Sequence, residues 1–474
     1  MNRRVKEFLE GKEILSLGPR ILELSITTAC DSSCLGCWCH SPFVDFPQEK
    51  KGLFLPFNII EELICELKEK GLEEVQISGA GEPLLHPQLK EIISLIKRKG
   101  IRCHLVTNFL SAGDEEILFF IEEGLDLLTV SLWAGTPETF VLLHPNRKEE
   151  DFERISEKLK KLRKERDERG KFYPKVKVYH VLNHLNAEEM EVMLQHALDV
   201  GADMIEFKSI DIIPGKTDFL AFTENDVQVL LESIERLKKK VDFPYSVNYD
   251  PLNVPHLIVF DDIELRKEIM DYGRFLLKNL LPPGFSVSFD HLDPNNPEPE
   301  QLNVRCPKKR INHKSILREE PDQSFYFFFF REYCKGCPMI STCFLRDDEV
   351  KEVRLPYLSL LALGRLEREI TNYQKKGSYA CDIVDKIPCY TGWLYARVEA
   401  DGEVIPCCKG HAFPVGNIFE KSFWEIWNGE KERLFRREGR KLLKEGPIFQ
   451  LIGCRKGCDN IGLNISFHGE ILTG

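Results

Sequence analysis

Three cysteines stand within eight residues of one another near the start of the chain: Cys30, Cys34 and Cys37. Thiolates at this spacing can wrap one [4Fe-4S] cluster, and three ligands leave the fourth iron of the cube open. The alternative is a zinc site with Cys39 or His40 as its fourth ligand, because zinc favours thiolate and imidazole. The spacing therefore predicts a metal centre on a loop.

A glycine-rich segment, Ser78-Gly79-Ala80-Gly81-Glu82-Pro83, follows a second strand-like segment. Glycines let backbone carbonyls approach a ligand closely. Taken alone, the segment is an ordinary turn between a strand and a helix. Its place one strand–helix unit after the three cysteines makes it more specific.

The two segments together resemble the radical S-adenosylmethionine (SAM) superfamily, which has the motif C-x3-C-x2-C and a GGEP segment. The resemblance implies that SAM chelates the open iron and is split reductively to a 5'-deoxyadenosyl radical. It implies that residues 79–83 bind the SAM ammonium group, with Glu82 holding the turn. Family members usually place an aromatic residue before the third cysteine; here Gly36 stands there, and we expect Trp38 to cover the cluster instead.

The resemblance further implies that polar residues at later strand ends lie near the SAM ribose and methionine: Thr107, Asn108 and Ser131. The full set of expected cofactor-binding residues is Gly79, Ala80, Gly81, Glu82, Pro83, Thr107, Asn108 and Ser131. For Thr107, Asn108 and Ser131, the alternative is an ordinary polar residue at the end of a strand whose hydrogen bonds are made within the protein. His180 and Asn183, at another strand end, are candidates to face the substrate, and no catalytic residue is assigned.

Four further cysteines near the C-terminus can saturate one [4Fe-4S] cluster: Cys389, Cys407, Cys454 and Cys458. Residues 393–408 alternate in polarity on both sides of Asp401-Gly402, which predicts a hairpin. This region resembles the SPASM/twitch extension, and the resemblance implies an auxiliary cluster that transfers electrons. A structural zinc ribbon is the alternative.

A third group, Cys334, Cys337 and Cys343, precedes the hairpin, whereas SPASM proteins place such spacing after it. With Cys306, or with Cys381, this group is a candidate for a second auxiliary cluster, a zinc site or neither. The other cysteines include Cys103, which is in phase with apolar strand residues and is predicted to be buried. Cys65 has no partner at ligand spacing, and Cys408 is expected only to flank the auxiliary site.

Strand-like and helix-like segments alternate from residue 21 to about 245, which predicts parallel strands joined by helices. The expected strands are residues 21–27, 74–78, 101–107, 126–132, 175–181 and 203–209. Asn186 and Glu189 are predicted to form a capping box at one of the helices. Six such units suit an α/β fold with a partial (β/α)6 TIM-like barrel, whose chemistry sits at the C-terminal ends of the strands.

The expected domains are an N-terminal extension (1–15), the barrel (16–245), a linker and insertion (246–380) and a smaller α+β, cysteine-rich auxiliary domain (381–474). The aromatic run of residues 325–330 is expected to pack in a core. The chain has 474 residues, a net charge of −11 and no basic stripe, so a nucleic-acid partner is disfavoured.

No signal peptide and no apolar run of about 20 residues occurs, so we expect no membrane span. The sixteen cysteines then suggest metal ligands in a reducing cytoplasm. The resemblance implies a flavodoxin- or ferredoxin-type electron donor.

Two enzymatic interpretations compete. One is the oxidation, epimerisation or dehydration of a small molecule, possibly a sugar; the other is a SPASM-type maturase that modifies a ribosomally made peptide. Some twenty residues precede the expected barrel, too few for the winged-helix domain of several peptide maturases, so the small molecule is preferred. A non-catalytic iron-sulfur or zinc protein for electron relay is the alternative from another class.

Overall fold

The structure is a computed structural model that describes residues 3–241, 384–454 and 457–473, residue 370, and five strands between residues 286 and 355. The chain forms two compact units, of which the first joins Met1–Glu235 to Leu366–Leu472 and the second is Arg236–Arg365. The third cysteine group, Cys306, Cys334, Cys337 and Cys343, lies outside the described residues, as does Cys381.

Six parallel strands form the centre of the first unit and follow one another in chain order across the sheet. They are β1 (Ile21–Leu24), β2 (Glu74–Ile77), β3 (Arg102–Thr107), β4 (Leu127–Ser131), β5 (Lys175–Leu182) and β6 (Met204–Ser209). β6 ends the sheet without pairing to β1, so the barrel is not closed. The predicted partial barrel and all six of its strands are confirmed.

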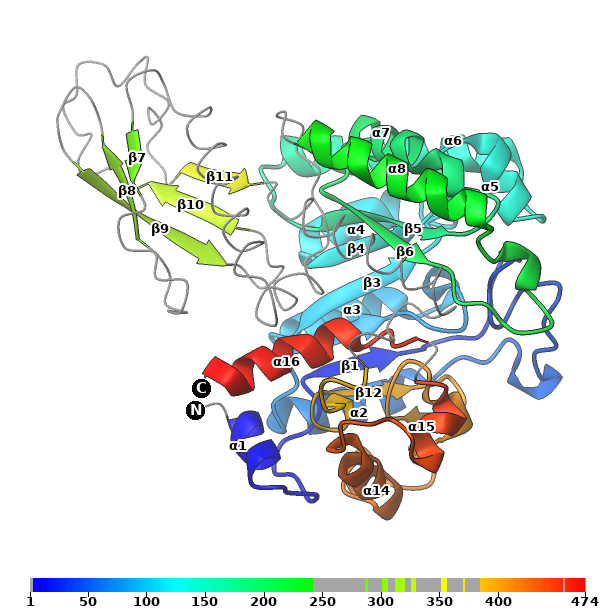
Figure 1. Cartoon of the computed structure of the whole chain (residues 1–474), viewed down its shortest axis with the longest axis vertical. Coiled ribbons are helices and arrows are strands. Elements are labelled where there is room, and N and C mark those ends of the chain that lie inside the picture. Colours follow the sequence, from blue (N-terminus) through cyan, green and yellow to red (C-terminus); the bar gives the residue numbers. More distant parts are fainter. Residues whose placement is uncertain are drawn as a thin grey trace. The chain divides into compact units, whose positions relative to one another are not determined.

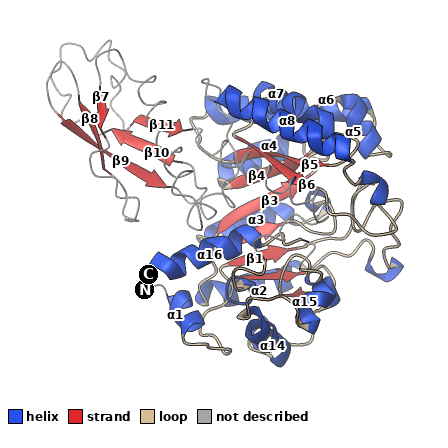
Figure 2. Cartoon of the chain, viewed as in Figure 1, coloured by secondary structure: helices blue, strands red, loops and turns tan. Residues whose placement is uncertain are grey.

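Helices cover one face of this sheet, as Figure 2 shows. They are α2 (Phe57–Glu69), α3 (Leu89–Arg98), α4 (Asp114–Glu123), α5 (Pro137–Leu143), α6 (Glu149–Glu168), α7 (Met190–Asp199) and α8 (Glu224–Val241). In α2 the buried residues Ile60, Leu63, Ile64 and Leu67 recur at helical spacing, which gives the helix one apolar side for the sheet. Within the described residues, no helix is both long and apolar enough to cross a membrane.

The two faces of the sheet differ in polarity because side chains alternate along a strand. On β1, Leu22 and Leu24 are fully buried, whereas Glu23 between them contacts the hydroxyl of Ser78 just beyond β2. The face away from the helices is therefore lined with polar groups. This is the face on which chemistry is possible.

The C-terminal segment extends the same sheet. β12 (Tyr395–Val398) pairs in parallel with β1, and β13 (Glu403–Ile405) and β14 (Gly416–Asn417) follow antiparallel. The predicted hairpin is confirmed, with Gly402 in its turn at φ +82°. Its first strand is shorter than expected because Trp393 belongs to a short helix, α12 (Thr391–Leu394).

The other helices of the first unit come from both ends of the chain. They are α1 (Arg3–Leu9), α13 (Phe423–Trp427), α14 (Glu430–Gly439), α15 (Pro447–Ile452) and α16 (Ile461–Thr473), labelled in part in Figure 1. Arg20, just before β1, pairs with Glu470 of α16 at 2.6 Å. Long-range contacts of this kind join the two ends of the sequence into one unit.

The predicted capping box at Asn186 and Glu189 is wrong. Asn186 makes no capping hydrogen bond; its amide nitrogen donates instead to the carbonyl oxygens of Trp133 (2.7 Å) and Val181 (2.9 Å). Glu189 accepts hydrogen bonds from the segment before α5, including the Thr136 hydroxyl at 2.9 Å. Both side chains thus hold strand-end loops together rather than the start of α7.

The second unit contains an antiparallel sheet in the order β11-β10-β9-β8-β7. Its strands are β7 (Ser286–Ser288), β8 (Gln301–Arg305), β9 (Asn312–Glu319), β10 (Phe325–Phe329) and β11 (Lys351–Leu355). The aromatic run forms β10, which lies between β11 and β9. Its packing in a core stays a prediction.

Candidate functional site

The first cysteine group lies on the loop that follows β1. The backbone N–H of Ser32 points at the sulfur of Cys30 (3.4 Å), and the N–H groups of Cys39 and His40 point at that of Cys37 (3.4 and 3.3 Å). Hydrogen bonds of this type stabilise thiolates. The loop thus directs backbone donors at the sulfurs of Cys30 and Cys37.

Side chains from later strand ends hold this loop in place. Asp31 accepts hydrogen bonds from the Asn108 amide (2.7 Å) at the end of β3 and pairs with Arg147 (2.9 Å) before α6. Asn146 accepts from the backbone N–H of Ser33 at 2.9 Å. These contacts tie the cysteine loop to the strand ends of the barrel.

Burial raises the pKa of the Cys30 thiol to about 12 and also raises the pKa values of Cys34 and Cys37. Free thiols here are neutral at ordinary pH, and a bound cation is what turns such groups into thiolates. Across the described ranges, no three side chains converge closely enough to hold a single metal ion. A cube takes each thiolate on a different iron, so these residues fit a cluster.

The glycine-rich segment packs directly on the cysteine loop. A Cβ on Gly81 would lie 2.4 Å from the carbonyl oxygen of Ala29 and 2.6 Å from that of Thr27. The next N–H, of Glu82, donates to the same Ala29 oxygen at 2.8 Å. Gly79 has φ +121°, a conformation that favours glycine. Only glycine lets the two segments approach this closely.

Glu82 is a buried carboxylate surrounded by donors. It accepts from the backbone N–H groups of Leu84 (3.0 Å) and Asn108 (2.7 Å) and from the Thr107 hydroxyl (2.5 Å). Burial nevertheless raises its pKa to about 7. Thr107 and Asn108, both expected near SAM, thus brace the glycine-rich turn and, through Asp31, the cysteine loop.

We expect Glu82→Gln to destabilise the protein, because all three partners donate and the new amide nitrogen must face one of them. The expected loss is about 1–3 kcal/mol of unfolding free energy in urea. The raised pKa means that the folded state holds the proton more tightly, so Glu82 makes wild-type protein less stable as pH rises from about 4.5 to about 7. The Glu82→Gln variant has no titrating carboxyl group at this position, so its stability lacks this dependence on pH.

The control for that variant is Glu115→Gln. Glu115 lies on α4, and its exposed carboxylate pairs with Lys90 of α3. A change within about 0.5 kcal/mol is expected there. Equal stability of the Glu82 and Glu115 variants at neutral pH would refute the bracing role.

The space beside Gly36 is already filled. A Cβ there would lie 2.9 Å from Ile210 and 3.1 Å from the ring of Trp133, whose indole N–H donates to the Ser131 hydroxyl at 2.8 Å. This explains why no aromatic side chain stands before the third cysteine. Trp38 stacks instead near His411, with ring centroids 4.3 Å apart, and its covering of a cluster stays a prediction.

The two candidates on the fifth strand serve the fold. The Asn183 side chain closes a turn, accepting from the N–H of Leu185 (2.9 Å) and donating to Val181 (3.1 Å). His180 lies on the helix-facing side of β5, stacked on Phe207 with centroids 5.7 Å apart. Burial lowers the pKa of His180 to about 3, so its ring is neutral.

The polar face also holds a group of residues that the sequence analysis did not single out. Glu23 of β1 accepts from the hydroxyls of Ser78 (2.5 Å) and Tyr395, and the Cys408 thiol lies 3.6 Å from it. The available signal was a charged residue in the middle of an apolar strand. Cys408, expected only to flank the auxiliary site, joins this polar group.

Arg397 of β12 lies between two glutamates on the same face. Its Nε is 2.7 Å from Glu399, its Nη1 is 3.3 Å from Glu23, and its guanidinium lies 5.5 Å from the Trp38 ring. Its Nη2 is buried and makes no hydrogen bond with any described residue. The polar face therefore offers a cation whose Nη2 has N–H groups to spare, close to the cysteine loop.

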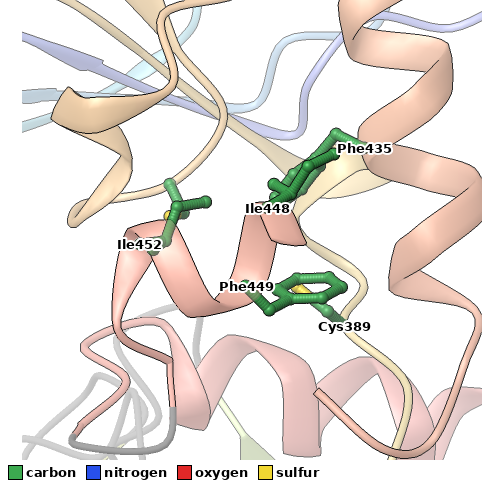
Figure 3. Close-up of a cluster of buried hydrophobic side chains, with 6 residues drawn as sticks. Cys389, Phe435, Ile448, Phe449 and Ile452 are labelled. Carbon is green, nitrogen blue, oxygen red and sulfur yellow. The ribbon is translucent and has the colours of Figure 1, made fainter. Parts of the chain in front are cut away.

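The second cysteine group gathers at the end of the extended sheet. Cys389 and Cys407 are buried, and Cys454 packs against the same cluster of apolar side chains: Phe435, Ile448, Phe449 and Ile452. Figure 3 shows the Phe449 ring beside Cys389. Cys458 is an electrostatic neighbour of Cys389 and Cys454. Four thiols at or near this apolar cluster form a donor set that suits a four-cysteine cluster.

Comparison with known protein families identifies two domains in the chain. The family model of the radical SAM superfamily matches residues 24–197, and that of the SPASM iron-sulfur cluster-binding domain matches residues 389–447. The chain carries a radical SAM domain followed by a SPASM domain. The first match contains the cysteine loop and the glycine-rich segment, and the second begins at Cys389.

Two curated relatives match parts of the chain. The tungsten-containing aldehyde ferredoxin oxidoreductase cofactor-modifying protein of Pyrococcus furiosus is 27% identical over 190 residues, 39% of this chain and 49% of that protein. A probable GTP 3',8-cyclase of Methanococcus maripaludis is 34% identical over 114 residues, 24% of this chain and 36% of that protein. The chain thus spans half or less of the length of these two relatives.

Solved structures share the fold over most of the chain. SuiB of Streptococcus suis aligns with a TM-score of 0.50 and 13% identity, covering 90% of this chain and 69% of SuiB. SuiB bound to the precursor peptide SuiA aligns with a TM-score of 0.50 and 14% identity, covering 95% and 70%. At this identity the likeness shows the fold.

Proposed function

We propose that this protein is a radical SAM enzyme that abstracts hydrogen from a peptide substrate, with Cys30, Cys34 and Cys37 as the ligands of its SAM-binding cluster. The observation that carries the proposal is the direct packing of the glycine-rich segment on the cysteine loop at the ends of β1 and β2. This places three thiols beside backbone groups suited to bind the methionine part of SAM.

When bound, the cluster and SAM supply the 5'-deoxyadenosyl radical, which is chemistry that no side chain offers. The residues of the chain itself orient SAM and shield it from solvent. Residues 79–83 accept the SAM ammonium group on backbone carbonyls, while Glu82, Thr107 and Asn108 keep that turn against the cysteine loop. Ser131, fixed by Trp133, is the proposed polar contact further along SAM.

Cys389, Cys407, Cys454 and Cys458 hold an auxiliary cluster in this proposal. Aromatic and aliphatic side chains pack around Cys389, Cys407 and Cys454, and four thiolates leave no position for SAM. The role that remains is electron transfer. A flavodoxin- or ferredoxin-type protein is the proposed donor for the SAM-binding cluster.

The peptide substrate is supported by the shared fold with SuiB, one structure of which contains a precursor peptide. The polar face adds a buried arginine with a free donor, which suits a carbonyl oxygen. A small-molecule substrate is the second candidate, favoured by relatives named GTP 3',8-cyclase. The relative from Methanococcus maripaludis matches 24% of this chain.

The test uses anaerobically reconstituted protein with dithionite and SAM, supplemented with a peptide fraction or a peptide-free metabolite fraction of the source cells. We expect the peptide fraction to increase 5'-deoxyadenosine formation and protease treatment of that fraction to remove the increase. Stimulation by the metabolite fraction alone would favour the small molecule. Absence of 5'-deoxyadenosine in every sample would leave an electron-relay protein.

A further inference from the structure

Lys444, between α14 and α15, is a buried ammonium group with only 3% of its surface exposed. Its three N–H bonds are all used by backbone carbonyls, of Ile387 (3.0 Å), Lys441 (2.8 Å) and Leu442 (2.7 Å). Three fixed acceptors hold the charge in one place. The ammonium group is therefore held in one position, unlike that of a flexible surface lysine.

This charge has no carboxylate ion pair within the parts of the chain that the structure describes. Asp385 is near, but its carboxylate accepts from the backbone N–H of Lys444 at 2.7 Å rather than from Nζ. Lysine is almost never fully buried unless it is paired, because an uncompensated charge in the interior is costly. Carbonyl dipoles solvate the ammonium group, but they do not neutralise it.

The second cysteine group lies beside this ammonium group. Ile387, one of its acceptors, stands two positions before Cys389, and Nζ lies 5.8 Å from the ring centroid of Phe449, which packs in the same cluster as that cysteine. Lys444 also interacts electrostatically with Cys454 and Cys458. Four thiolates around a cluster would supply the negative charge that the surroundings of Lys444 lack.

We propose that Lys444 is the fixed countercharge of the auxiliary site and favours the more reduced state of the group bound there. A cluster that takes up one electron gains one negative charge, so a cation held nearby stabilises the reduced form more than the oxidised form. Lys444 is a positioning residue: it holds a positive charge near the auxiliary site and does not contact the substrate. The inference rests on the proposed auxiliary cluster.

The test is a redox titration followed by electron paramagnetic resonance, in protein whose Cys30, Cys34 and Cys37 are replaced by alanine. At the potential that half-reduces the auxiliary signal of the parent, we expect Lys444→Gln to lower the ratio of reduced to oxidised cluster about tenfold. For one electron, this ratio corresponds to a shift of about −59 mV. An unchanged midpoint with full iron content would overturn the proposal.

The matched control is Lys441→Gln, which removes the same charge three residues away. Lys441 is exposed and pairs with Glu438, so solvent screens it, and we expect its midpoint to equal that of the parent. An equal shift in both variants would mean that net charge, rather than the buried ammonium group, sets the potential, and would overturn the inference.

Two further variants separate a failure of the proposed Lys444 role from a failure of the cluster assignment. Lys444→Arg retains the positive charge. If Lys444→Gln loses iron while Lys444→Arg keeps it, the site requires a countercharge. Loss of iron in both variants contradicts the role of charge. Cys407→Ser must remove the auxiliary signal. If it does not, the cluster assignment fails, independently of Lys444.

Discussion

Alanine at Cys30, Cys34 and Cys37 together is expected to remove about four irons per chain and to lower SAM cleavage under dithionite by more than about 100-fold. The reason is that these thiols are the proposed ligands of the SAM-binding cluster, and contacts with the strand ends of the barrel hold their loop. Iron and 5'-deoxyadenosine are measured on anaerobic protein. The auxiliary signal should persist.

The control is Cys39→Ala. Cys39 is buried next to the loop but lies outside the three-cysteine spacing, so its loss should leave iron content and SAM cleavage near those of the wild type. If this single change removed the cluster, Cys39 would be a ligand. The open coordination position, or the assignment of iron over zinc, would then be wrong.

Gly81→Ala is expected to abolish measurable SAM binding and to lower the unfolding free energy by about 1–3 kcal/mol or more. The added Cβ would lie 2.4 and 2.6 Å from two backbone oxygens, which cannot rotate away as a flexible side chain would. The glycine-rich segment must then separate from the cysteine loop. Equilibrium dialysis with labelled SAM and denaturation in urea measure the two effects.

Gly113→Ala is the matched control, because a Cβ there would meet only the end of the flexible Glu116 side chain, at 3.1 Å. We expect a stability change within about 0.5 kcal/mol and unchanged SAM binding. Wild-type affinity in the Gly81 variant would contradict the packing role of this glycine.

The barrel was predictable because its signals are local. Short apolar segments separated by helical periodicity gave all six strands, and the cysteine spacing and the segment at Gly79–Pro83 identified the superfamily. The hairpin was also predictable, since alternation on both sides of Asp401-Gly402 is a short-range pattern. In each case the residues that specify the element lie within it.

What could not be predicted depends on contacts between distant parts of the chain. Nothing local indicates that β12 pairs with β1, so the meeting of Glu23 and Arg397 was not foreseen. The capping box at Asn186 failed because that side chain is taken by carbonyls of other loops. The glycine at position 36 likewise depends on a distant residue, Trp133, whose ring fills the space beside it.

Anaerobic protein, reduced with dithionite and mixed with SAM, tests most directly whether the first cysteine group leaves an iron vacant. We predict equal amounts of methionine and 5'-deoxyadenosine from protein that holds roughly eight or more irons per chain. Protein with this iron content that leaves SAM intact, or with zinc in the loop after β1, would contradict the proposed chemistry.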